Sequence, residues 1–251
     1  MLVTGASRGI GAAIAREFAA RGARVSLAAR SAGPLDELAA ELDGYALPCD
    51  LFDAAQVNGL VGRAEAAAGP VDVLVNNAGM EYTKSFFDTT EAEIDDVVRL
   101  NLTVPMQLTR MVLPGMRERN RGHVLNISSM AANGGFPGLA VYCGTKSGLS
   151  HFGRILLEDL HGSDVKVTTL EVARADRPAR PARVPADGEV VRPTPPPAVM
   201  PNVSAERVAR AAADGVERGK RAVWPPRRAF LFGALVGAPQ RIVRPLIAGV
   251  R

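Results

Sequence analysis

The sequence has few cysteines, histidines and aromatic residues, and it has no long hydrophobic run. The two cysteines and three histidines are scattered through 251 residues, so neither a disulfide framework nor a metal site is predicted. No apolar stretch approaches the roughly 20 residues that a membrane-spanning helix needs. The chain runs from Met1 directly into a glycine-rich turn, with no secretory signal at this end. These features predict a cytoplasmic protein.

The net charge of +4 is small, and its distribution is uneven. From Met200 onward, nine arginines and one lysine stand against three acids. Residues 229–251 combine apolar residues with Arg241 and Arg244, which leaves two interpretations open. One is peripheral contact with an anionic membrane, and the other, which we favour, is packing on a partner subunit or over a pocket. Aromatic residues do not interleave with the basic ones, so nucleic-acid binding is not predicted.

The most informative stretch runs from the buried strand around Val124–Ile127 into the start of a helix. On that helix Tyr142 and Lys146 stand four residues apart and project from one face. An ammonium group beside a phenol favours the phenolate, which lowers the pKa of the phenol from its ordinary value of about 10. Ser129, at the end of the strand, is placed to bond the same substrate oxygen. On this pattern alone, an exposed Tyr and Lys on a solvated helix remains an alternative.

The beginning of the chain predicts a strand, a glycine turn and a helix over Leu2–Gly22. The spacing of Gly5, Gly9 and Gly11 is G-x-x-x-G-x-G. Glycines let the backbone approach a pyrophosphate closely, and a helix N-terminus supplies amide donors and a favourable dipole. A plain glycine-rich turn is the structural alternative.

The second strand, Ala23–Ala29, ends in Arg30, where an enzyme selective for NAD would be expected to place an acid. Arg30, together with Ser7 and Arg8 in the glycine turn, suits a 2′-phosphate, because arginine binds phosphate bidentately. An ordinary surface charge is the alternative for Arg30. A fourth strand, Val71–Val75, leads into Asn76-Asn77-Ala78-Gly79, where small residues leave room for a cofactor.

Helices are predicted over 36–42 and 54–68, and over 204–218 with Ser204 as the cap. A long helical pattern covers 91–119, and breaks are expected near Pro105 and Pro114.

These motifs together resemble the classical short-chain dehydrogenases/reductases, closely over residues 2–172 and loosely over 203–225. The resemblance implies a Rossmann-like, doubly wound parallel sheet in a single domain. It implies Ser129, Tyr142, Lys146 and Asn101 as catalytic residues, with Asn101 holding a water in the proton relay. It implies cofactor contacts from the following positions: Gly5, Ser7, Arg8, Gly9, Ile10, Gly11, Arg30, Asp50, Leu51, Asn77, Ala78, Gly79, Tyr142 and Lys146. Asp50 would face the adenine ring.

The implied activity is hydride transfer between NADP(H), preferred over NAD(H), and a carbonyl or alcohol substrate, in a homodimer or homotetramer. Phe86, Phe87, Phe136 and Leu139 flank the expected pocket and suggest a lipophilic substrate. Cys143 adjoins Tyr142 and is interpreted as a packing residue. Two alternatives stay open: a non-catalytic NADP-binding or membrane-associated regulatory protein, and an epimerase or dehydratase.

The resemblance weakens after the sixth strand, Val165–Leu170. Family members normally show Pro-Gly there, whereas this chain reads Glu171-Val172-Ala173. Residues 174–200 contain seven prolines and five arginines with little apolar periodicity, which predicts a mobile loop. We favour a long substrate lid over the alternative, which is impaired binding of the nicotinamide. We therefore expect a domain over 1–225 and an amphipathic, basic and apolar C-terminal extension over 226–251.

Overall fold

The computed structural model describes residues 1–134, 136–173 and 202–225. The expected lid over 174–200 and the extension over 226–251, with its suggested membrane contact, lie outside the described residues. The domain boundary at residue 225 therefore stays a prediction. Within the described part of the chain, no helix combines the length and apolarity needed to cross a membrane.

Seven parallel strands form one sheet in the order β3-β2-β1-β4-β5-β6-β7. The strands are β1 (Leu2–Thr4), β2 (Ser26–Ala29), β3 (Tyr45–Pro48), β4 (Val73–Asn76), β5 (Gly122–Ser129), β6 (Val165–Val172) and β7 (Ala222–Val223). The order reverses between β1 and β4, and in open parallel sheets ligands bind at the carboxyl ends of the strands at such a reversal. The expected doubly wound α/β fold is confirmed.

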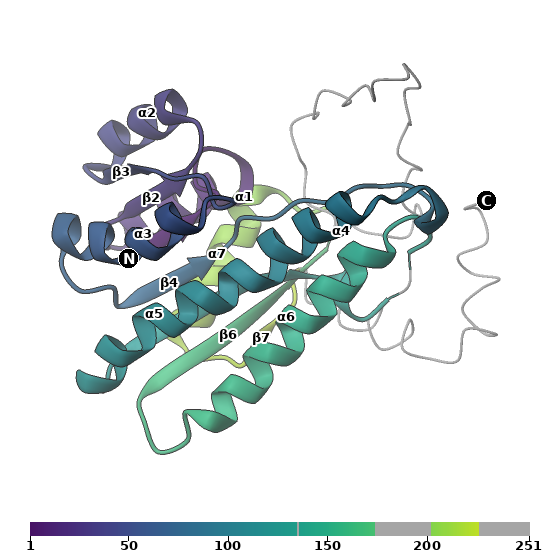
Figure 1. Ribbon diagram of the computed structural model, residues 1–251. Coiled ribbons are helices and arrows are strands. Elements are labelled where there is room, and N and C mark those ends of the chain that lie inside the picture. Colours follow the sequence, from purple (N-terminus) through teal and green to yellow (C-terminus); the bar gives the residue numbers. More distant parts are fainter. Residues whose placement is uncertain (135, 174–201, 226–251) are drawn as a thin grey trace.

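Helices cover both faces of the sheet (Figure 1). One face carries α1 (Gly9–Ala20), α2 (Ala32–Leu42) and α7 (Ala205–Glu217). The other carries α3 (Ala54–Ala68), α5 (Val104–Glu118) and α6 (Ala140–Asp159), with α4 (Glu91–Val98) leading into α5 and contacting α6. Short helical turns are η1 (Phe86–Asp88), η2 (Arg99–Thr103) and η3 (Met130–Ala132).

The central strands are apolar on both sides because both of their faces are covered. Leu2 and Leu74 pack into the core beneath α3 and α5, whereas their neighbours Val3 and Val75 pack into the core beneath α1 and α2. All four side chains are fully buried. Strands buried on both faces read as continuous hydrophobic runs rather than as an alternating pattern.

The long helix predicted over 91–119 is interrupted near Pro105, as predicted, but not near Pro114. The break is η2, a π-helical turn at Arg99–Thr103, directly before Pro105. Proline has no backbone N–H, so residue 105 cannot donate to the carbonyl of residue 101, which favours a wider turn there. Pro114 lies inside α5 without ending it. The predicted break at Pro114 is therefore wrong.

Other boundaries shift by a few residues. The helix over 54–68 is confirmed, and so is the cap of α7, where the Ser204 hydroxyl accepts from the amide of Arg207. α2 begins at Ala32 rather than Asp36, because Pro34 falls in its first turn, where proline is tolerated. β2 is shorter than predicted, and β6 is longer.

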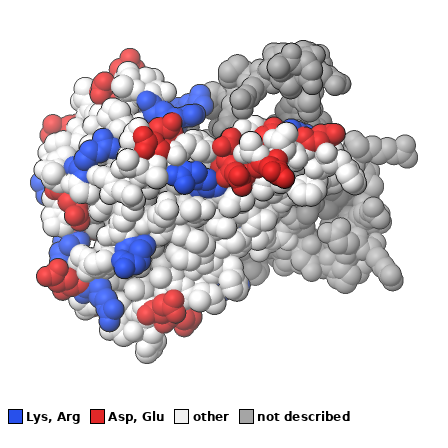
Figure 2. Space-filling model, in the orientation of Figure 1, with Lys and Arg blue, Asp and Glu red and all other residues white. Residues whose placement is uncertain are grey.

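Charges of both signs are interspersed on the face drawn in Figure 2, where acidic side chains gather around α4. Over the residues coloured there, this face has no continuous basic patch of the kind that binds nucleic acid.

Candidate active site

The glycine turn lies between β1 and α1 at the reversal of strand order. Gly5 and Gly9 adopt φ values of +65° and +59°, which L side chains rarely adopt. α1 begins at Gly9, has no side-chain cap bond at Arg8 and has no acid in its first turn. The free N–H groups of its first turn and the positive end of its dipole therefore lie at the carboxyl ends of the strands. These donors fit the pyrophosphate of a dinucleotide.

The turn is fixed to the end of β4 by hydrogen bonds around Thr4. The Thr4 hydroxyl accepts from the amides of Asn77 at 3.0 Å and Ala78 at 3.1 Å. In return, Asn77 Nδ2 donates to the carbonyls of Thr4 at 2.8 Å and Gly5 at 3.2 Å. A Cβ on Gly5 would lie 2.9 Å from Ala78 Cα, so the close approach of the two loops requires glycine.

The residues expected to bind the adenosine part of the cofactor also lie at the carboxyl ends of the strands, since all strands run parallel. Arg8 and Arg30 are exposed, with Arg30 directly after β2. Asp50 follows β3, and its carboxylate accepts from the amide of Phe52 at 3.0 Å, while Leu51 is buried. The two arginines are accessible to an anion at this edge.

Tyr142 and Lys146 lie one turn apart on α6, as expected, and both are buried. Lys146 Nζ lies 5.8 Å from the centre of the Tyr142 ring and donates to the carbonyl of Ile127 at 2.9 Å. The bond to β5 fixes where the ammonium group lies. Next to Tyr142, burial raises the pKa of the Cys143 thiol, which is typical of a packing residue rather than a nucleophile.

Asn101 lies in the π-helical turn and is fully buried. Its side-chain oxygen accepts from the amide of Met80 at 2.8 Å, and its Nδ2 donates to the carbonyl of Met80 at 2.8 Å. Nδ2 also lies 3.2 Å from the hydroxyl of Thr145, which donates to the carbonyl of Tyr142 at 2.8 Å. The widened turn thus ties the loop after β4 to the helix that carries Tyr142.

Ser129 ends β5 and caps η3, its hydroxyl oxygen accepting from the amide of Ala131 at 3.1 Å. This bond uses a lone pair of the oxygen, so the hydroxyl proton can still be donated to another acceptor. Ser129 therefore lies at the carboxyl ends of the strands, as the glycine turn does, and its hydroxyl can still donate a hydrogen bond.

The described part of the chain has two hollows, and one of them is lined by the expected catalytic residue Tyr142. A small one is lined by Tyr142 together with Tyr82, Lys84, Phe86 and Gly138, among others. Of the aromatic residues expected around the pocket, Phe86 lines this hollow, whereas Phe87 is 99% exposed.

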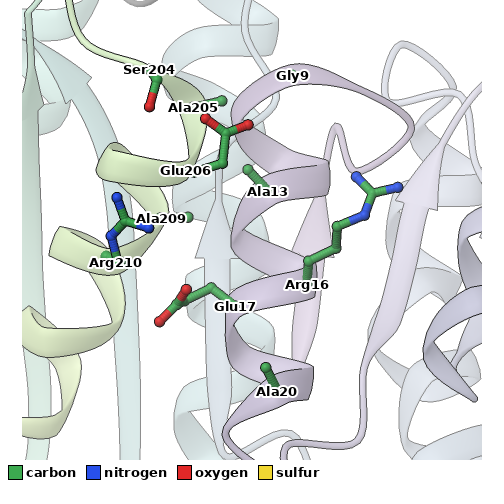
Figure 3. Close-up of a pocket in the computed structure, with 10 residues that line it drawn as sticks. All are labelled: Gly9, Ala13, Arg16, Glu17, Ala20, Ser204, Ala205, Glu206, Ala209 and Arg210. Atoms are coloured by element: carbon green, nitrogen blue, oxygen red, sulfur yellow. The ribbon is translucent and has the colours of Figure 1, made fainter.

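The second hollow, of about 660 Å³, lies between α1 and α7 (Figure 3). Arg16 and Glu17 come from α1, and Glu206 and Arg210 from α7. It contains none of the expected catalytic residues, and its mixture of small residues and opposite charges describes a groove between two packed helices.

A group of polar residues beneath α6 could not be predicted from the sequence. Glu171 is buried in β6, and burial raises the pKa of its carboxyl group to about 7. Ser150 Oγ lies 2.7 Å from Glu171 Oε1, and Ser150 Oγ in turn lies 2.7 Å from Ser128 Oγ. The available signal was a single acid inside an apolar strand, and its partners lie far away in sequence.

Comparison with known proteins agrees with this arrangement. A family model described as short chain dehydrogenase matches residues 1–180. The ketoacyl reductase HetN of Nostoc sp. is 37% identical over 175 residues, a match that covers 68% of this chain and 61% of HetN. The matched region thus spans about three-fifths of the length of that relative.

Solved structures match more of the chain. A short-chain dehydrogenase from Streptomyces avermitilis has a TM-score of 0.81 at 30% identity, covering 98% of this chain and 95% of that one. A short-chain dehydrogenase from Sphingobium yanoikuyae, in complex with NADPH, has a TM-score of 0.78 at 28% identity, covering 100% of this chain and 95% of that one.

Proposed function

The chain belongs to the short-chain dehydrogenase family, and we propose that it is an NADP(H)-dependent oxidoreductase that interconverts a carbonyl compound and an alcohol. The observation that carries the proposal is the position of Tyr142 and Lys146. They lie one helical turn apart at the same end of the sheet as the glycine turn. Lys146 donates to the carbonyl of Ile127, and Thr145, which Asn101 contacts, donates to the carbonyl of Tyr142.

The roles of the side chains follow from their donors. In the direction of reduction, the Tyr142 hydroxyl would donate its proton to the carbonyl oxygen as the carbon accepts a hydride. The Lys146 ammonium would stabilise the resulting phenolate, and the Ser129 hydroxyl would donate a second hydrogen bond to the substrate oxygen. Asn101 would support resupply of the proton. NADPH, when bound, supplies the hydride.

The cofactor would be held along the edge already described. The amides of Gly9, Ile10 and Gly11 and the turn from Gly5 through Ser7 would bind the pyrophosphate. Arg8 and Arg30 would bind the 2′-phosphate, and the loops that carry Asp50 and Leu51, and Asn77, Ala78 and Gly79, would flank the adenosine and the nicotinamide ribose. The exposed positions of the two arginines support this assignment.

The experiment that tests the function is titration of the purified chain with NADPH and NADH, followed by a panel of ketones and 3-oxoacyl thioesters. We expect NADPH binding and turnover of at least one carbonyl class; the ketoacyl reductase among the relatives motivates the thioesters. NADPH binding without any turnover would favour a non-catalytic, regulatory protein instead. Conversion of the substrate without net oxidation or reduction would favour an epimerase or dehydratase.

Removing Arg30 should affect one cofactor and spare the other. In Arg30→Ala we expect the Kd for NADPH to rise about 10- to 100-fold, the usual effect of losing hydrogen bonds to a charged group, with the Kd for NADH unchanged. Arg218→Ala, at the exposed C-terminal end of α7, is the matched control, because it removes the same charge elsewhere. Equal affinity of the wild type for both nucleotides would refute the assigned preference.

We extend the proposal to a homodimer or homotetramer formed through the helices that carry Asn101 and Tyr142. These helices lie side by side on one face of the sheet, and Ile155 of α6 is 46% exposed there (Figure 1). A monomer in analytical ultracentrifugation would contradict this.

A further inference from the structure

Glu171 is a buried carboxylic acid close to the proposed catalytic helix. It is 5% exposed and pairs in register with Ser128 of β5. Alternate residues of the same strand, Val165 and Val167, belong to the core on the α6 side, so Glu171 points toward α6. Its Oε2 is buried and has no hydrogen-bond partner. Ionisation would therefore leave Oε2 without the hydrogen-bond donor that a buried charge needs.

Three contacts connect this carboxyl group to the backbone of Lys146. Ser150 Oγ lies 2.7 Å from Glu171 Oε1, and Ser128 Oγ lies 2.7 Å from Ser150 Oγ. Ser128 Oγ donates to the carbonyl oxygen of Lys146 at 3.2 Å. The contacts form a chain from β6 through α6 and β5 to the helical turn that bears Lys146.

The number of available protons decides whether all three contacts can be hydrogen bonds. Each serine hydroxyl has one proton to donate, so two serines can supply only two of the three hydrogen bonds. If Glu171 is ionised it supplies none, and one contact is left without a proton. If Glu171 is protonated, it donates to Ser150, Ser150 donates to Ser128, and Ser128 donates to the Lys146 carbonyl. All three contacts are then hydrogen bonds in one direction.

We infer that Glu171 is a positioning residue that, as a neutral carboxylic acid, starts this hydrogen-bond chain and fixes the turn of α6 that carries Lys146. The inference rests on the proposed function only in giving Lys146 a role in the reaction. Ionisation of Glu171 removes one bond from the chain and loosens the turn.

Among the residues that the structure describes, three side chains act on the Glu171 carboxyl group. From α6 the Lys146 ammonium acts on it and lowers the pKa of the carboxyl group, as do the serine hydroxyls, but burial has the larger effect and raises the pKa to about 7. The turn η3 also contacts β6, but its Met130 packs into the core on the opposite face of the sheet. Because the folded chain binds this proton more tightly than the unfolded chain, its contribution to stability is fully present below the ordinary glutamate pKa. That contribution is lost as the pH rises through about 7.

The protonation state can be measured directly by infrared spectroscopy of the intact protein. We expect a carboxylic-acid C=O band at pH 6 that disappears with a midpoint near pH 7 and is missing at pH 6 from Glu171→Gln. No variant needs to fold for the wild-type band to be observed. A wild-type spectrum without a protonated carboxylic acid at pH 6 would overturn the inference.

Three variants test the positioning. Glu171→Gln keeps a donor to Ser150 at every pH, Glu171→Leu removes it at similar volume, and Ser150→Ala interrupts the chain without altering the glutamate. At pH 6 we expect hydrogen-exchange protection of residues 142–150 to fall about tenfold in Glu171→Leu and Ser150→Ala, but not in Glu171→Gln. Above pH 8, protection should fall in the wild type and be retained in Glu171→Gln.

Activity adds an independent readout. We expect kcat/KM of Glu171→Gln to match the wild type at pH 6 and to keep that value at pH 8, where the wild type declines. Equal effects of Gln and Leu on exchange and on the pH profile would leave only a packing role and refute the inference. Should no carbonyl be reduced at all, the proposed function fails, while the infrared band and the exchange data still decide the role of Glu171.

Discussion

Replacing Tyr142 by Phe is expected to lower kcat for carbonyl reduction by about 10²- to 10⁴-fold, the range that a general acid contributes. The change removes only the hydroxyl group, so the ring keeps its place on α6 beside Lys146. The Kd for NADPH should change less than about threefold. Stopped-flow or steady-state measurement of NADPH oxidation, together with fluorescence titration of the cofactor, separates these two effects.

Tyr45→Phe is the matched control, because it removes the same hydroxyl from an exposed position on β3, at the opposite edge of the sheet from β7. It should retain wild-type kcat. If Tyr142→Phe keeps more than a tenth of the wild-type kcat, Tyr142 does not donate the proton in the rate-limiting step. If it loses NADPH binding, the Tyr142 hydroxyl is needed to bind the cofactor, which contradicts a role confined to proton donation.

Most of the fold could be predicted because each strand is a short apolar run followed by a turn signal. The glycine turn, the helix over 54–68 and the cap at Ser204 depend on local chemistry alone, and the structure agrees with them. The break near Pro105 could be predicted because proline lacks the N–H that the preceding turn needs, whereas its π-helical form could not. The break expected near Pro114 is not found, because that proline lies inside α5.

The candidate site divides in the same way. Tyr142 and Lys146 are four residues apart, so their common face follows from helical geometry. The chain of Ser128, Ser150 and Glu171 could not be found by spacing, because its neighbours are separated by 22 and 21 residues and lie on three elements. Only the parallel pairing of β5 with β6, and the packing of α6 across both, brings these hydroxyl and carboxyl groups together.

Gly11→Ala is expected to destabilise the fold by about 3 kcal/mol, at the upper end of the usual cost of overpacking. A Cβ at this position would lie 2.3 Å from the carbonyl oxygen of Gly5 and 2.5 Å from Asn77 Nδ2. Neither atom can withdraw easily, because Asn77 Nδ2 is bonded to the carbonyls of Thr4 and Gly5. The β1 turn must therefore move away from α1, which also displaces the amides proposed to bind pyrophosphate.

We accordingly expect NADPH affinity to fall by more than about 100-fold in Gly11→Ala, together with a lower urea midpoint at an unchanged m-value. Gly59→Ala is the control: Gly59 is exposed in the middle of α3, and a Cβ there would meet no atom within 4 Å. That variant should gain about 0.5–1 kcal/mol, because alanine forms helices better than glycine, and it should bind NADPH like the wild type. A Gly11→Ala protein with wild-type stability and affinity would mean that the glycine turn can move enough to accept the Cβ atom. The contact between Gly5 and Gly11 would then not set the position of the pyrophosphate donors.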